Sequence, residues 1–295
     1  MTPSARRAAI VLVLFASLAL AAQPAREPVS VMSFNIRYGD ARDGENAWPL
    51  RRDLLFEVVR DENADVVGLQ EALDTQINEI VEAVPAYAVV GVGRDNGQRA
   101  GEFSAILFKK DRFAVAEAGT FWFSDTPTVP GSKSWGNSIT RICTWARFVR
   151  RDGLPVWVYN VHLDHQSQPS RERSTELLRD RIAARPFPEE PVIVTGDFNV
   201  GEQNPALHTL VGPPTGAGAS GPRLFVDTFR ALHPDETTVG TYNAFKFGTV
   251  SGDKIDYILV PPGTEVMRAD IVRTSRGERY PSDHFPVVAQ VRFSR

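Results

Sequence analysis

The spacing of apolar and polar residues along the chain predicts a mixture of strands and helices. Short apolar or alternating runs mark strands, and apolar residues recurring every three to four positions mark helices. Helices are predicted at 50–60, 73–84 and 171–184; in the first, the apolar residues at 50, 54, 55, 58 and 59 form one stripe. Strands are predicted at 29–35, 65–69, 87–92, 103–108, 112–120, 144–149, 155–161, 191–195, 255–260, 266–274 and 286–293.

The order of these elements predicts an α/β fold. Strands alternate with helices early in the chain and follow one another later, and Arg151-Asp152-Gly153 is typical of a hairpin turn. Proline-, glycine- and serine-rich stretches at 124–138 and 213–222 predict loops. No internal repeat or linker divides the chain, so we expect a mixed sheet or two packed sheets covered by helices, as a single domain over 22–295.

The first 21 residues have the pattern of a secretory signal peptide. Arg6 and Arg7 precede an apolar run at 8–20, and Ala19-Leu20-Ala21 forms a small-x-small cleavage site. The alternative is a membrane anchor, but the run is shorter than the ~20 apolar residues that span a bilayer. A twin-arginine export route stays open. The sequence predicts an exported, periplasmic or secreted protein with no stable membrane anchor.

Composition narrows the class of protein. Of 295 residues, 42% are hydrophobic and 23% charged, which is typical of a globular chain. Cys143 is the only cysteine, which excludes an internal disulfide and a cysteine-rich metal site; we expect it to be buried. The formal net charge is −3, and the loss of two arginines with the leader makes it about −5. An acidic surface disfavours nucleic acid as a partner, and we expect a monomer.

Polar residues stand where several predicted strands end. Asn35 ends the first strand, Glu71 comes soon after the strand at 65–69, and Asp197 follows the strand at 191–195. Residues of the same kind at other strand ends are Gln70, His162, Asp164 and Asn199. Any one alone would be typical of a cap or a turn, but open α/β sheets assemble their sites from such ends. Oxygen ligands and histidines without thiols favour a hard cation over zinc or copper.

Six short motifs, in order, resemble the endonuclease/exonuclease/phosphatase superfamily. They are SFNIR at 33–37, LQE at 69–71, NVHLDH at 160–165, GDFN at 196–199, KIDY at 254–257 and SDHFP at 282–286. The segments at 130–135 and 141–145 are similar to a branch of secreted bacterial members. The resemblance implies a four-layer α/β/β/α sandwich of the DNase I-like kind, made of two packed mixed sheets flanked by helices, with the active site at one end.

The resemblance also implies a metal site. Glu71 matches the principal Mg²⁺ ligand of the family, and Asn35 lies beside it in the metal and phosphate cluster. Asp256 belongs to a second carboxylate cluster, which would hold a second metal position, and Asp283 is assigned to the metal site as well. Mg²⁺ is the expected cofactor, with Mn²⁺ or Ca²⁺ as alternatives, because one strong carboxylate plus water and substrate phosphate suits such ions.

Catalytic roles follow from the same resemblance. Asp197 matches the residue that orients or deprotonates the attacking water, and Asn199 matches an amide that contacts the phosphate. His284 matches a histidine that donates to a non-bridging oxygen, and the expectation is that Asp283 orients it. His162 matches a histidine near the phosphate and the leaving group.

Four further residues are candidates for substrate binding. Arg141 could contact the phosphate or form a structural ion pair, and Asp164 could shape the pocket or the metal cluster. Trp135 could line the cleft or belong to the core, and Lys254 could bind phosphate or pair with Asp253.

The sequence therefore predicts an exported, metal-dependent hydrolase that acts on a phosphate-ester substrate by direct attack of activated water. A phosphodiesterase is the leading hypothesis. The alternative is a secreted nuclease acting on DNA or RNA, and a non-catalytic binding module on the same fold is a third reading. Glu71, Asp197 and His284 have the residue types of the family's catalytic motifs, which disfavours the non-catalytic module.

Overall fold

The computed structural model describes residues 26–212 and 224–294 and arranges their strands in two six-stranded sheets. The predicted signal peptide (1–21) and the loop predicted at 213–222 lie outside the described residues. The first sheet contains β1 (Val29–Asn35), β2 (Val66–Gln70), β3 (Tyr87–Val90), β4 (Ile106–Lys109), β11 (Glu265–Ile271) and β12 (Val287–Arg292). Its strand order is β11-β12-β1-β2-β4-β3, with β1 and β2 parallel.

The second sheet is built from the middle of the chain. It contains β5 (Phe113–Trp122), β6 (Ile142–Arg150), β7 (Pro155–His162), β8 (Val192–Asp197), β9 (Val226–Asp227) and β10 (Asp256–Val260). Its order is β5-β6-β7-β8-β10-β9, with β7 and β8 parallel. The predicted hairpin around Asp152 is confirmed, since β6 and β7 pair antiparallel on either side of it.

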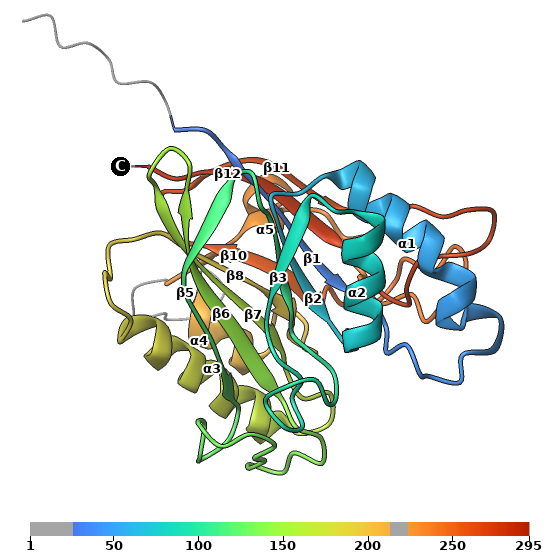
Figure 1. The fold of residues 1–295 in the computed structure, drawn as a ribbon, viewed down its shortest axis with the longest axis horizontal. Coiled ribbons are helices and arrows are strands. Elements are labelled where there is room, and N and C mark those ends of the chain that lie inside the picture. Colours follow the sequence, from blue (N-terminus) through green and yellow to red (C-terminus); the bar gives the residue numbers. More distant parts are fainter. Residues whose placement is uncertain (1–25, 213–223, 295) are drawn as a thin grey trace, which may run out of the picture.

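Helices cover the outer faces of both sheets (Figure 1). α1 (Trp48–Glu62) and α2 (Asp74–Ala83) cover the first sheet, and α3 (Gln168–Ala183) and α4 (Pro205–Val211) cover the second. α5 (Thr228–Leu232) contacts β10 and β11, one strand of each sheet, and a short 3₁₀ helix lies at Gly44–Asn46. Helix α1 begins two residues before the predicted start because Pro49 fits the first turn, where its missing N–H costs nothing. It ends at Asn63, whose left-handed backbone (φ 47°) closes the last turn.

Three apolar clusters separate four layers. One lies between the sheets and includes Val31 of β1 and Val158 of β7. The second packs α1 and α2 onto the first sheet, and the third packs α3 and α4 onto the second. Burying a side chain such as Leu178 of α3 contributes roughly 1.5–3 kcal/mol. The predicted α/β/β/α sandwich is therefore confirmed.

A polar contact joins the two sheets below the ends of β2 and β7. The amide of Asn160 donates to the carbonyl oxygens of Leu69 (2.8 Å) and Ala105 (2.9 Å), and it accepts from Gln70 Nε2 at 2.7 Å. Gly68 makes room for this approach, since a Cβ there would lie 2.2 Å from Thr195 Oγ1. The tie holds the strand ends that carry polar residues at a fixed separation.

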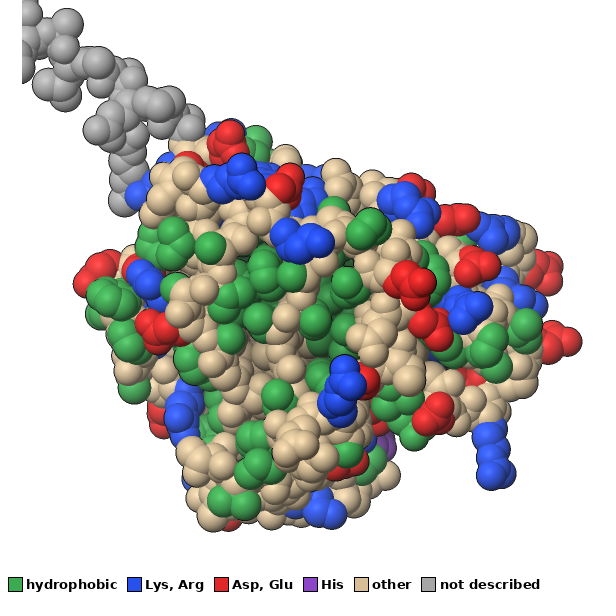
Figure 2. Space-filling view, viewed as in Figure 1, with side chains coloured by type: hydrophobic (Ala, Val, Ile, Leu, Met, Phe, Trp, Pro, Cys, Tyr) green, Lys and Arg blue, Asp and Glu red, His purple; other side chains and the backbone are tan. Residues whose placement is uncertain are grey.

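The edges of both sheets meet on one face of the molecule. Apolar side chains gather over the middle of that face in Figure 2, with charged side chains mainly around its margin. Val89 of β3 and Val115 of β5 are among the exposed apolar residues. Among the described residues, no helix has the length and apolarity needed to cross a membrane.

Candidate active site

The carboxyl ends of the central strands converge on one pocket of about 390 Å³. β1 and β2 run parallel in one sheet and β7 and β8 in the other, so Asn35, Glu71 and Asp197 arrive at the same end. β10 runs antiparallel to β8, and its register sets Asp256 opposite Asp197. The predicted meeting of these residues at one end of the strands is what the structure contains.

Asp197 lies at the centre of the site. Its Oδ2 accepts from Asn35 Nδ2 at 3.0 Å and faces His162 Nε2 at 3.6 Å and His284 Nε2 at 3.8 Å. Its Oδ1 accepts from the backbone N–H of Asn199 at 2.9 Å. Burial, followed by the neighbouring Asp256 carboxylate, raises the pKa of Asp197 to about 7. A carboxylate with such a pKa is suited to accept a proton near neutral pH.

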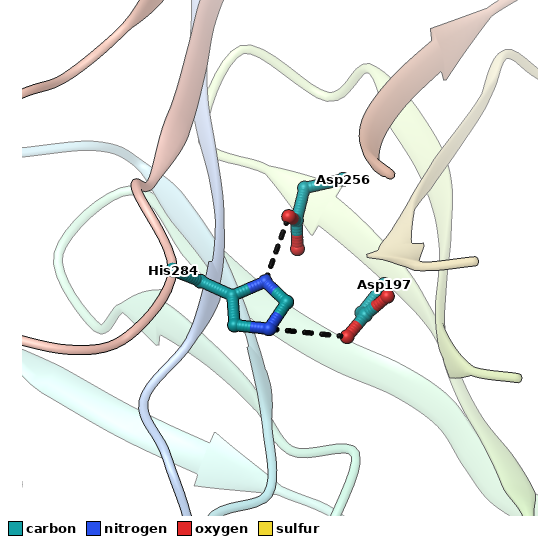
Figure 3. Close-up of side chains that lie close together, drawn as sticks. All are labelled: Asp197, Asp256 and His284. Atoms are coloured by element: carbon teal, nitrogen blue, oxygen red, sulfur yellow. Dashed lines mark hydrogen bonds and ion pairs between the residues drawn. The ribbon is translucent and has the colours of Figure 1, made fainter. Parts of the chain in front are cut away.

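His284 is held by Asp256 (Figure 3). Its Nδ1 lies 2.9 Å from Asp256 Oδ2, while its Nε2 points towards Asp197. Burial alone would lower the pKa of His284, but the carboxylates of Asp256 and Asp197 outweigh it and raise that pKa well above its ordinary value. The imidazole is therefore a cationic donor at neutral pH.

The expectation that Asp283 orients His284 is wrong. Residues 281–283 form a bend before β12, and the imidazole nitrogens of His284 face Asp256 and Asp197 instead of Asp283. Its Oδ1 accepts from Ser282 Oγ at 3.3 Å, and its Oδ2 lies 3.8 Å from Arg37 Nε. Asp283 still lines the pocket, where burial raises its pKa, so its assignment to the metal side of the site stays a prediction.

Glu71 lines the other side of the pocket, where it contacts the fully buried Asn35. Glu71 follows β2 in a left-handed conformation (φ 59°), which is uncommon for a residue with a side chain and occurs at functional sites. Its Oε2 accepts from the backbone N–H of Tyr38 at 2.9 Å, and its Oε1 accepts from Asn35 Nδ2 at 3.1 Å. Burial would raise the pKa of Glu71, but the Tyr38 amide, His284 and Asn35 outweigh it and lower that pKa. Asn35 thus presents its nitrogen, not its oxygen, to the two carboxylates.

The donor atoms fit a hard divalent cation. One ligand atom each from Asp197, Asp256 and His284 lie within 4.8 Å of one another. Asp256 Oδ1 is buried without a hydrogen-bond partner, which is costly unless a cation or water satisfies it. Glu71 and Asp283 add carboxylates across the pocket. Oxygen-rich sites of this kind suit Mg²⁺, Mn²⁺ or Ca²⁺.

His162 and Asn199 complete the predicted set around Asp197. Burial, followed by the charges of Arg141 and Arg94, lowers the pKa of His162 well below its usual value, so this imidazole is neutral. Asn199 adopts a left-handed backbone (φ 51°), and its Nδ2 donates to the carbonyl oxygen of Leu163 at 3.0 Å. Both side chains line the pocket.

The pocket wall beside His162 is rich in charge. Arg141, predicted as a substrate-binding residue, lines this wall together with His165, and their Nη2 and Nδ1 atoms lie 2.9 Å apart. Sequence reasoning missed Arg94 and Glu102, which form a bidentate ion pair with both contacts at 2.7 Å. They come from the loop between β3 and β4, where no apolar periodicity marks a position.

Three predicted substrate-binding residues lie outside the pocket. Asp164 is fully buried, and its Oδ1 accepts from the backbone N–H groups of Gln166 and Ser167, which are part of the turn before α3. Trp135 donates to Asp125 at 2.8 Å and packs against the third apolar cluster. These are structural roles, as expected for polar groups that satisfy local donors and for aromatics at a core margin.

Lys254 is the third of these residues. It is buried, and its Nζ lies 2.7 Å from Asp227 Oδ2 and 3.3 Å from the centre of the Tyr257 ring. The expectation of a phosphate contact or of a pair with Asp253 is wrong, because the side chain points into the protein towards β9 and away from the pocket.

Sequence reasoning also missed residues at the mouth. Arg37 lies within a recognised motif, yet no role was predicted for it; it binds Asp43 and approaches Glu71 at 4.0 Å. Tyr242 stacks edge-on against His284 and is half exposed. It belongs to a long segment without regular structure, where no strand or helix pattern could single it out.

The arrangement can carry out hydrolysis by water. Asp197 can accept a proton from a water molecule, and the cationic His284 can donate to an oxygen that gains negative charge. Both groups face one pocket, and neither needs to form a covalent bond with the substrate.

Comparisons with known proteins agree with this geometry. An endonuclease/exonuclease/phosphatase from Bacteroides vulgatus has a solved structure that matches 91% of this chain and all of that chain, with 30% identity and a TM-score of 0.81. A mannosyl-6-phosphatase from Bacteroides thetaiotaomicron matches 90% of this chain and all of that chain, with 32% identity and a TM-score of 0.77.

A curated viral relative and a family model add to these matches. An uncharacterised protein, L388 of Acanthamoeba polyphaga mimivirus, is 29% identical over 170 residues, which is 53% of this chain and 60% of the viral protein. The chain thus spans less than two thirds of that relative's length. The model of the Endonuclease/Exonuclease/phosphatase family matches residues 32–284, which include every residue described in the pocket. The chain belongs to the Endonuclease/Exonuclease/phosphatase family.

Proposed function

We propose that the protein is a divalent-metal-dependent phosphoesterase that hydrolyses its substrate by direct attack of water. The observation that carries the proposal is the position of Asp197. One of its carboxylate oxygens faces Asn35, His162 and the His284–Asp256 pair from three different strand ends. A single buried carboxylate surrounded by donors is the arrangement expected of a base that holds a water molecule.

The residues divide the work between the nucleophile and the phosphate. Asp197 orients the water and accepts its proton, since its negative charge would repel phosphate oxygens directly. His284, kept cationic by Asp256, donates from Nε2 to a non-bridging phosphate oxygen. Asn199 and the neutral His162 supply further polar contacts at the phosphate. Such positioning and charge stabilisation account for most of the catalysis in phosphoryl transfer.

The carboxylates of Glu71, Asp283, Asp197 and Asp256 would hold one or two divalent cations. A bound cation would neutralise the developing negative charge and polarise the phosphate. We propose Mg²⁺, with Mn²⁺ or Ca²⁺ as alternatives, because oxygen ligands dominate the set.

The substrate is either a phosphodiester or a phosphomonoester. The sequence predicts a phosphodiester, and the acidic chain makes long nucleic acids the less favoured substrates. The relative described as a mannosyl-6-phosphatase acts, by that name, on a phosphomonoester of a sugar. A pocket of about 390 Å³ has room for a small alcohol group, such as a sugar, in an ester of either class.

Export is proposed from the leader pattern alone. Cleavage near Ala21 would release the protein to the periplasm or the medium. N-terminal sequencing of protein recovered from its native host tests this, and an intact Met1 on a membrane-bound form would contradict it.

The main experiment is a panel of phosphate esters in Mg²⁺, Mn²⁺, Ca²⁺ or EDTA. We expect turnover of p-nitrophenyl phosphate, bis-p-nitrophenyl phosphate or mannose 6-phosphate, lost in EDTA and greatly reduced in Glu71→Gln. Asp180→Asn is the control, because it removes one negative charge from a carboxylate on α3 that is 65% exposed and does not line the pocket. Full turnover after dialysis against EDTA would contradict the proposal.

A further inference from the structure

Three arginines line the pocket, and two of them are neutralised by carboxylates. Arg37 donates from Nε and Nη2 to both oxygens of Asp43 at 2.9 Å. Arg94 donates from Nη1 and Nη2 to both oxygens of Glu102 at 2.7 Å. Bidentate pairs of this kind are strong and fix the side chain in one geometry. The positive charge of each of these two arginines is therefore balanced by a hydrogen-bonded carboxylate.

Arg141 differs from these two arginines. Its hydrogen-bond contact is with His165, and burial followed by the charge of Arg141 lowers the pKa of that imidazole, so His165 is neutral. The nearest carboxylate oxygen, Asp164 Oδ2, lies 3.8 Å from Nε, and neither atom makes a hydrogen bond. The opposite oxygen of Asp164 is engaged by two backbone N–H groups. Among the described residues of the pocket lining, Arg141 is the arginine without a hydrogen-bonded carboxylate.

The side chain of Arg141 is held in place within the wall. It is only 3% exposed, yet it lines the pocket together with His162 and Asp197. Nη1 makes no hydrogen bond with the described residues. A buried guanidinium with an unused donor is costly unless an anion in the pocket accepts from it.

A second, very small space adjoins this guanidinium. It is lined by Arg141 and His162 together with Arg94, Glu102, Thr140 and Ile142, and it amounts to about 10 Å³. That is roughly the room needed for one water molecule and far too little for an alkyl or sugar group. An ester substituent therefore has no room on that side of Arg141, which leaves space only for an unsubstituted phosphate oxygen.

We propose that Arg141 is the specificity-determining residue that selects phosphomonoesters over phosphodiesters at this site. The inference rests on the proposed phosphoesterase function and deepens it. A phosphomonoester dianion has one more unsubstituted, charged oxygen than a diester has, and that oxygen can accept from the guanidinium of Arg141. The planar fork of a guanidinium is suited to phosphate oxygens. A diester with its second substituent on that side would clash with the closed wall and would leave the donor unpaired. The favoured substrate is thus a phosphomonoester of a small alcohol.

The first test compares two esters with the same leaving group. We expect the wild type to prefer p-nitrophenyl phosphate to bis-p-nitrophenyl phosphate in kcat/KM. Losing one charge-assisted contact should lower that ratio by roughly tenfold to a hundredfold in Arg141→Gln. Arg141→Lys keeps the charge without the fork and should fall between the two. Arg173→Gln is the matched control, because this arginine on α3 is 65% exposed and does not line the pocket.

The second test measures binding without turnover. Calorimetric titration at pH 8 with inorganic phosphate and with dimethyl phosphate, in Mg²⁺ and in EDTA, compares a dianion with a monoanionic diester. We expect wild type and Arg173→Gln to bind phosphate more tightly, and Arg141→Gln to lose most of that difference. If Arg141→Gln does not fold, as judged by circular dichroism, the wild type and Arg141→Lys still decide the question.

The outcomes separate the two proposals. A preference for the diester in the wild type, or equal losses on both esters in Arg141→Gln, would overturn the role of Arg141 while the phosphoesterase function stands. Hydrolysis of neither ester, nor of mannose 6-phosphate, would contradict the proposed function, and the binding ratio would then test Arg141 on its own.

Discussion

At the scale of single residues, Asp197 and His284 should account for most of the rate. We expect Asp197→Ala and His284→Ala each to lower kcat by at least ~10²–10³-fold, in line with general-base and electrostatic contributions. Because their side chains lie 3.8 Å apart and act on one transition state, the double variant should lose less than the product of the two. Single variants that keep more than about a tenth of wild-type kcat would contradict these roles.

The pH profile of kcat should depend on Asp256. Activity needs Asp197 deprotonated and His284 protonated, which gives a bell-shaped profile: the raised pKa of Asp197 sets the acid limb, and the raised pKa of His284 sets the alkaline limb above the ordinary histidine range. The negative charge of Asp256 raises the pKa of both groups. In Asp256→Asn both limbs should therefore move to lower pH, and activity should be lost earlier as pH rises.

The control for that profile is Asp253→Asn, a nearby exposed carboxylate that does not line the pocket. Its bell should coincide with that of the wild type. An unchanged alkaline limb in Asp256→Asn would show that His284 does not depend on this partner.

Sequence reasoning identified the polar residues of the site but not all of their partners. Asn35, Glu71 and Asp197 could be predicted because the apolar run of each strand shows where that strand ends, and these residues stand at or just after those ends. The partner of His284 was assigned to adjacent Asp283, whereas pairing of β10 with β8 supplies Asp256 from 28 positions away. Adjacency in sequence says little about contact when neighbouring side chains diverge.

At the scale of elements, the buried ion pair of Lys254 and Asp227 should contribute to the stability of the fold and not to catalysis. It joins the start of β10 to β9 and α5, where Asp227 Oδ1 also accepts from the backbone N–H of Phe229. Lys254→Met would leave a largely buried carboxylate unpaired and should cost about 3–5 kcal/mol in the free energy of unfolding. Urea denaturation measures this, and kcat/KM of the folded fraction should stay at the wild-type value.

A second variant separates the charge from the packing. In Lys254→Met combined with Asp227→Asn, no unpaired charge remains and the amide can still cap α5, so part of the lost stability should return. A fall in kcat/KM in parallel with stability would instead restore the phosphate role that was predicted for Lys254.

Elements with long periodic patterns could be predicted, and short ones could not. α1 and α2 were predicted to within two residues at each end because their apolar stripes cover several turns. The helices α4 and α5 and the two-residue strand β9 were missed, since seven, five and two residues carry too little periodicity. The loop that carries Arg94 and Glu102 is positioned by tertiary contacts alone, so the charged wall became visible only in the folded chain.

At the scale of the whole molecule, the pocket gathers negative charge at one end of an otherwise well-packed sandwich. Glu71, Asp283 and Asp197 line the pocket and Asp256 lies against His284, and three of the four carboxylates have little exposure to solvent that could screen their repulsion. A bound cation would relieve this repulsion in the native state only. Metal binding should therefore be visible in the stability of the protein as well as in its activity.

We expect Mg²⁺ to raise the melting temperature relative to EDTA. At a hundredfold excess over its Kd, a ligand of the native state adds about 2.7 kcal/mol of stability, which for a chain of this size is a shift of several degrees. Glu71→Gln should reduce the shift strongly, whereas Glu176→Gln, a half-exposed carboxylate on α3, should leave it unchanged. Differential scanning calorimetry over a range of Mg²⁺ concentrations gives the Kd for each variant. If Glu71→Gln and the wild type showed the same dependence on Mg²⁺, Glu71 would not be a ligand, and the cation would have to be held by the other carboxylates, Asp197, Asp256 and Asp283.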